Sequence, residues 1–192
     1  PPPGLPNIEK ARRMREVINR LTQAADTATC YTVLSPCLRD LAPEWFAEEK
    51  AKFDELGGID AYLAYKHEAY IAELTQYKES GELYFTQEIT DEVIDFVRND
   101  PKVHVGVREG DRIIATKIPY SAKQYLAESD PLLKRYYYCH CPWARELIRA
   151  GETGVPPVFC LCSAGFQKKP WETVFGQELK VEVLESVLAG DQ

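Results

Sequence analysis

The sequence of 192 residues lacks several features that would place it outside the cytoplasm. It has no run of about 18 apolar residues, so we expect no helix that spans a membrane. Its start, PPPGLPNIEK, lacks the basic stretch followed by an apolar one that a signal peptide requires, and the chain has no N-x-Ser/Thr site. Six cysteines are too few for a small disulfide-dense fold. These absences predict a cytoplasmic protein with no membrane partner.

Sequence patterns typical of nucleotide and metal sites are also lacking. We find no GxGxxG, phosphate-binding loop, HExxH, GxSxG or EF-hand pattern. The 30 Asp and Glu residues outnumber the 23 Lys and Arg residues, which gives a net charge of −7. Because an acidic chain is poorly suited to a nucleic-acid groove, we expect no nucleic-acid partner.

Apolar residues are plentiful and make up 45% of the chain, which excludes a disordered protein. They recur at helical spacing over 14–25, 45–56 and 62–77, and Gly57 and Gly81 are suited to end the second and third of these segments. We therefore predict a helical N-terminal part over 1–81 and an α+β, cysteine-rich, ligand-binding part over 82–192, both within one compact domain.

Alternating apolar residues predict strands in the second part. Val103, Val105 and Val107 alternate with other residues, and a turn at 109–111 leads into a second strand over 112–118, which is typical of a β-hairpin. Further strands are predicted over 136–141, 158–162 and 179–184, and helices over 142–148 and 170–175. Helices and strands mixed without regular alternation indicate an α+β fold, a mainly antiparallel sheet with helices packed on it.

Four of the six cysteines form two pairs, Cys139-His140-Cys141 and Cys160-Leu161-Cys162. On a strand, residues two apart point to the same face. If the two strands are neighbours, the four sulfurs of Cys139, Cys141, Cys160 and Cys162 converge, as a tetrahedral zinc site requires. His140 points the other way on such a strand and is a poorer ligand. This interpretation makes zinc a candidate cofactor.

A second interpretation treats two of these cysteines as reactive thiols. Cys141 precedes Pro142, a residue favoured at the first position of a helix, so its sulfur faces the N–H groups of a helix N-terminus, which favours the nucleophilic thiolate. Cys162 stands before a small-residue segment ending at Gly165, where the backbone can approach a ligand closely. A third interpretation makes all four cysteines buried structural residues. The sequence alone does not decide among these three interpretations.

Aromatic and charged residues surround the cysteine pairs in the sequence. One interpretation is a pocket wall for a planar or apolar ligand, and the other is ordinary core. The candidate ligand-binding residues are Tyr138, His140, Trp143, Arg145, Phe166 and Trp171. For Lys168 and Lys169 we favour a solvated pair over an anion site.

The segment FCLCSAGFQKKPWETVFGQELKVEVLESVLAGD carries a family resemblance. It resembles the C-terminal motif of the L-2-amino-thiazoline-4-carboxylic acid hydrolase-like proteins and, more distantly, the vinyl-4-reductase-type small-molecule-binding domains, in an uncharacterised cysteine-rich bacterial branch. The resemblance begins at about Val103 and implies an α+β fold with a ligand pocket between sheet and helices. Some members bind Zn²⁺ through a cysteine like Cys162 and later Glu and Cys ligands. Here Val183 and Ser186 stand at two of those later positions, and the chain ends at Gln192 before the third, so only Cys162 is carried over.

Together these features predict a small-molecule-processing protein with a cysteine-lined pocket, hydrolase-like on a small ring or thio-compound. Cys141 is then the nucleophile or a metal ligand, and Cys162 is its partner across the pocket. The alternative is non-catalytic, a small-ligand sensor or a zinc-stabilised binding module, and a third hypothesis is an interaction protein that docks through the Tyr-rich helix at 60–79. The expected partners are a small-molecule ligand and a second copy in a homodimer.

Overall fold

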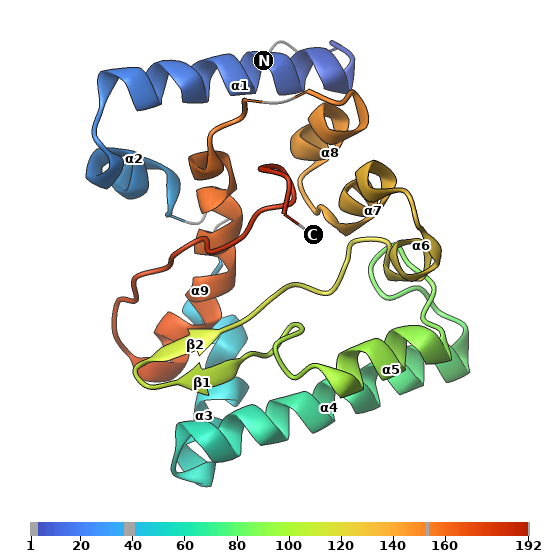
Figure 1. Ribbon diagram of the computed structural model, residues 1–192. Coiled ribbons are helices and arrows are strands. Elements are labelled where there is room, and N and C mark those ends of the chain that lie inside the picture. The colour runs from blue at the N-terminus through green and yellow to red at the C-terminus, as the bar shows by residue number, and fades with distance from the viewer. Residues whose placement is uncertain (1–3, 37–40, 153, 192) are drawn as a thin grey trace. The chain divides into compact units, whose positions relative to one another are not determined.

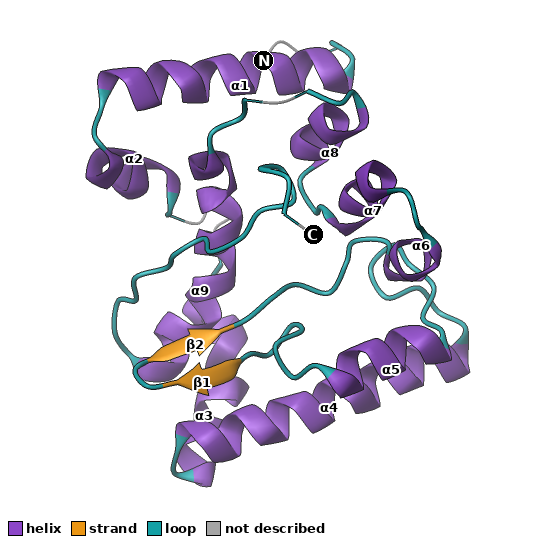
Figure 2. Cartoon of the chain, viewed as in Figure 1, coloured by secondary structure: helices purple, strands orange, loops and turns teal. Residues whose placement is uncertain are grey.

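The computed structural model describes residues 4–36, 41–152 and 154–191, and most of these are helical (Figure 2). In chain order the described α-helices are α1 (Asn7–Ala24), α2 (Thr27–Leu34), α3 (Ala47–Leu56), α4 (Ile59–Ser80), α5 (Asp91–Asn99), α6 (Ala122–Ala127), α7 (Pro131–Tyr138), α8 (Pro142–Arg149) and α9 (Leu161–Phe175). Two 3₁₀-helices, η1 (Pro43–Phe46) and η2 (Pro157–Cys160), lead into α3 and α9. The sheet seen in this part of the chain consists of β1 (Val107–Glu109) and β2 (Arg112–Ile114).

The predicted α+β fold, a mainly antiparallel sheet with helices packed on it, is wrong. The expected hairpin is present, with Val107 opposite Ile114, but each strand has only three residues. The first half of the segment 136–141 forms the end of α7, and 158–162 spans η2 and the start of α9. The segment 179–184 has no regular secondary structure. The protein is therefore a mainly helical one with a short hairpin.

Capping groups explain why the aromatic segment before Cys139 is a helix. The Asp130 carboxylate accepts the backbone N–H groups of Leu132 and Leu133 at 2.8 and 3.0 Å, which satisfies two donors in the first turn of α7. Pro131 occupies the first position of that helix, where its missing N–H costs nothing. Tyr and Phe favour strands only in a suitable tertiary context, so this local start signal prevails.

The chain divides into two compact units. Unit 1 combines residues 1–50 with 139–192, and unit 2 is the stretch 51–138 between them. In unit 1, α1 lies against α8 (Figure 1). Ala11 and Ile18 are buried on α1, as are Ala144, Leu147 and Ile148 on α8. These apolar residues make this helix pair a part of the core of unit 1.

Charged side chains join the end of α8 to α1 in the same unit. The Arg12 Nε atom donates to Glu152 at 2.7 Å, and Arg15 forms a second ion pair with the same carboxylate. The hydrogen bond from Arg12 is the main cause that holds the pKa of Glu152 below its usual range. Arg12 and Arg15 of α1 are therefore both paired within the unit.

Unit 2 is built around the long helix α4, with α5 packed beside it (Figure 1). The buried residues of α4 are Tyr62, Leu63, Tyr70, Ile71 and Leu74, and those of α5 are Val93, Ile94 and Val97. His67 belongs to the same interface, because its Nε2–H donates to the Val97 carbonyl oxygen at 2.9 Å. The unit also contains the β1–β2 hairpin, helices α6 and α7, and α3 from Ala51 onward.

Candidate functional site

The first cysteine pair lies between α7 and α8 rather than on a strand. Cys139 is only 8% exposed, and its thiol points toward the Cys141 carbonyl oxygen at 4.0 Å. Cys141 is half-buried and is the N-cap residue of α8, and its carbonyl oxygen accepts the Arg145 N–H at 2.9 Å. The prediction that Cys141 stands at a helix N-terminus is therefore confirmed. The strand predicted over 136–141 is absent.

The second pair lies at the start of α9. Cys160 is the N-cap residue of this helix, and its Sγ atom lies 3.2 Å from the Ser186 Oγ atom. The Cys162 thiol points toward the Phe159 carbonyl oxygen at 3.9 Å, within the same turn. Residues two apart on a helix are separated by about 200° around its axis, so these two cysteines do not share a face as a strand would require.

All the described cysteines are free thiols, and Cys37 lies outside the described residues. In the part of the chain that is described, no three His, Cys, Asp or Glu side chains are grouped so that they can hold a metal ion. The convergence of four sulfurs predicted from the sequence rested on two neighbouring strands, which are not present. Zinc binding thus stays a prediction without a geometric basis in this fold.

The other residues predicted for the pocket do not share one unit. Tyr138 belongs to unit 2, where its hydroxyl is hydrogen-bonded to Thr116 and its ring lies 5.6 Å from that of Tyr125. His140, Trp143, Arg145, Phe166 and Trp171 are half-buried residues of unit 1. Trp171 stacks on Phe175 of the same helix at 5.8 Å, a contact typical of helix packing.

A buried ion pair on α9 fixes the segment that follows this helix. The Lys168 Nζ atom lies 2.7 Å from Glu172, and it also donates to the Leu179 carbonyl oxygen at 3.0 Å. Glu172 in turn accepts the Leu179 N–H at 3.2 Å. The side chains of Lys168 and Glu172 are only 12% and 13% exposed, so Lys168 is not the solvated residue that we expected. We call this set the α9 clamp.

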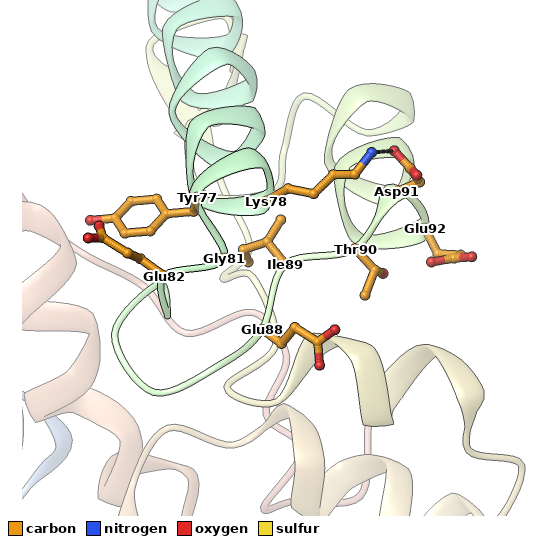
Figure 3. A pocket seen from close by; sticks show the side chains of 9 residues that line it. All are labelled: Tyr77, Lys78, Gly81, Glu82, Glu88, Ile89, Thr90, Asp91 and Glu92. Atoms are coloured by element: carbon orange, nitrogen blue, oxygen red, sulfur yellow. Dashed lines mark hydrogen bonds and ion pairs between the residues drawn. The ribbon is translucent and has the colours of Figure 1, made fainter.

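A pocket that sequence reasoning missed lies in unit 2, between the end of α4 and the start of α5 (Figure 3). Its volume is about 400 Å³, and its lining residues are Tyr77, Lys78, Gly81, Glu82, Glu88, Ile89, Thr90, Asp91 and Glu92. None of the candidate catalytic, ligand-binding or metal residues is among them, but Tyr77 and Lys78 belong to the Tyr-rich helix at 60–79 named in the third hypothesis. The sequence signal for this pocket is the acidic composition of 82–92 around a helix break.

Comparison with known proteins gives one match. The model of a family of unknown function, DUF6144, matches residues 110–192, a segment that contains all four paired cysteines. No curated protein and no solved structure matches the chain. In the described ranges no helix is long and apolar enough to span a bilayer. The hydrolase-like resemblance stays a prediction.

Proposed function

We propose that unit 1 carries thiol chemistry on a small molecule, with Cys141 as the nucleophile. The observation that supports this proposal is the position of Cys141 as the N-cap residue of α8, half-exposed and directly before Pro142. A thiol at this position stands at a helix start, where backbone N–H groups have no partner within the helix, and it is open to a substrate from solvent. The substrate class that we propose is the one implied by the resemblance, a small ring or thio-compound opened by hydrolysis.

The other thiols of unit 1 are less well placed for attack on a substrate. Cys139 and Cys30 are buried, with 8% and 1% exposure. The Cys30 thiol points toward the carbonyl oxygens of Leu21 and Ala25, both at 3.9 Å, which is a structural role in the α1–α2 corner. Cys160 is held near Ser186 at the start of α9. We therefore assign the first nucleophilic step to Cys141 and keep Cys162 as the second candidate from the sequence.

Native thiol labelling tests this assignment. With iodoacetamide near neutral pH, we expect Cys141 to be alkylated at least about tenfold faster than Cys30, because only the thiolate of an accessible cysteine reacts. The measurement is a time course of peptide masses from the full chain. The variant Cys141→Ser is expected to lose the fastest site and to leave the slow rate of Cys30 unchanged, which controls for folding. Equal rates at both residues would contradict the assignment.

Activity is tested separately with a 2-aminothiazoline carboxylate as the probe. Ring opening by hydrolysis adds one water to the probe, so mass spectrometry detects the product directly. We expect product with the wild-type chain and none above background with Cys141→Ser. A bound zinc ion would be seen by elemental analysis as about one metal per chain, with thiols that label only after a chelator is added. That result would contradict the role of Cys141 as nucleophile and would support the alternative, a zinc-stabilised binding module.

A further inference from the structure

The pocket of unit 2 has a strong excess of negative charge. Four of its lining residues are carboxylates, Glu82, Glu88, Asp91 and Glu92, and one is an ammonium, Lys78. Lys78 is ion-paired with Asp91 (Figure 3), and Glu88 is paired with Lys123 at 2.8 Å. Even with both lysines counted, the surface keeps an excess of two negative charges. The α4 helix also ends here, and its C-terminal carbonyl groups add partial negative charge.

An exposed apolar tip stands on the loop that lines this pocket. Phe85 is 83% exposed and Leu83 is 57% exposed, while Tyr84 between them is buried. Tyr84 and Gln87 exchange two backbone hydrogen bonds, at 3.0 and 3.1 Å, which close a tight turn around Phe85. Large apolar side chains exposed beside a pocket are typical of surfaces that bind a partner.

The tip packs on a group of aromatic rings. The ring of Phe85 contacts that of Tyr84 at 4.8 Å, edge to face, and Tyr84 contacts Tyr77 of the pocket wall at 5.3 Å. Burial raises the pKa of Tyr84 to about 12, so this anchoring phenol is neutral at physiological pH. Because two backbone hydrogen bonds close the turn that carries Phe85, little backbone entropy is lost when a partner binds there, which favours Phe85 as an anchor residue.

We propose that this face of unit 2, formed by residues 77–92, docks a basic peptide segment of a partner protein. An arginine or lysine side chain of the segment occupies the acidic pocket, and a neighbouring apolar side chain covers Phe85 and Leu83. Charge complementarity favours this partner, since the same carboxylates repel nucleic acid and anionic membranes. A volume of about 400 Å³ lies within the usual range of ligand pockets, roughly 300–1,000 Å³, and holds a whole basic side chain. A small amine would fill the pocket but leave the apolar tip uncovered.

A random peptide library displayed on phage tests the proposal with the full-length chain. We expect selection to enrich peptides that combine Arg or Lys with apolar residues, and their affinity to fall as salt rises. Phe85→Asn, a residue that tolerates the left-handed backbone at this position (φ 54°), is expected to weaken the selected peptides about tenfold or more. The double variant Glu82→Gln and Glu92→Gln is expected to weaken them about fivefold.

Matched control variants distinguish specific docking from nonspecific binding and from misfolding. Leu184→Asn removes an apolar residue of unit 1 that is 61% exposed, against 83% for Phe85. Glu68→Gln removes an exposed carboxylate of α4 outside the pocket. Both are expected to bind the peptides like the wild type, and all variants to unfold at the same temperature. No enrichment, enrichment of acidic peptides, or equal binding to Phe85→Asn overturns the proposal. Self-association that Phe85→Asn abolishes also overturns it, because the occupant is then a second copy.

Discussion

Alanine at position 165 is expected to lower the free energy of unfolding of unit 1 by about 3 kcal/mol. An added Cβ atom would lie 1.8 Å from the Ser35 carbonyl oxygen and 2.8 Å from its carbon. Ser35 is the buried C-cap residue of α2, so the atoms that must move belong to the backbone of a packed helix end. Relief requires α2 and α9 to separate, which exposes apolar surface of the unit.

Helix propensity and the steric clash at position 165 change stability in opposite directions, so the sign of the measured change distinguishes them. Gly165 lies inside α9, where helix propensity by itself favours alanine over glycine by about 1 kcal/mol. A decrease in stability therefore reports the close approach of α2. We expect thermal unfolding of the Gly165→Ala variant to begin about 6–12 °C lower than in the wild type. The control is Gly58→Ala, where the added Cβ has no neighbour within 4 Å, and a similar loss in both variants would contradict the close-packing argument.

Replacing Glu172 by glutamine is expected to have the second largest effect, a loss of about 2 kcal/mol. Glutamine keeps the size of the side chain but leaves the charge of Lys168 in a largely buried site without its counter-ion. The α9 clamp also holds the backbone of Leu179 at both its N–H and its carbonyl group. We therefore expect trypsin to cut faster at Lys180 in the Glu172→Gln variant, and the exposed neighbour Glu178→Gln serves as the control.

The stability difference between the wild type and this variant depends on pH through the pKa of Glu172 in the wild type. Burial by itself raises that pKa, but the hydrogen bonds from Lys168 and from the Leu179 N–H outweigh it and hold the value below its usual 4.5. A carboxyl group with a lowered pKa stabilises the fold above its unfolded value, and the contribution is lost as the pH falls through the folded value. The stability difference between wild type and Glu172→Gln should therefore shrink below about pH 4.5. A difference that is constant down to about pH 3 would contradict the clamp.

The sequence predicted some individual elements well because their signals are local. Helical spacing and end signals at Gly57 and Gly81 agree with α3 and α4, and the turn at 109–111 agrees with the hairpin. Pro142 placed Cys141 at the start of α8 because proline is compatible with the first helical position. Each of these features depends on a few neighbouring residues, so no tertiary contact was needed to find it.

The strands predicted around the cysteines failed because apolar and aromatic runs do not specify a partner. Such a run forms a strand only where another strand supplies its hydrogen bonds. In this protein, Asp130 caps the first segment into α7, and a proline-led turn leads the second into α9. The third segment is held by side chains instead, with Leu179 bonded to the α9 clamp and the Val181 N–H to the Tyr31 hydroxyl at 2.9 Å.

By itself the sequence determined an acidic chain, its principal N-terminal helices and a cysteine at a helix start. The tertiary structure decided which distant segments meet: Gly165 with Ser35, Lys168 with Leu179, and the end of α4 with the start of α5. It also decided that Cys141, Cys160 and Cys162 lie at helix starts and Cys139 directly after α7, rather than all four on one sheet face. The physical reason is that charge and capping act over a few residues, whereas packing partners far apart in the chain are selected by shape and by burial of the whole unit.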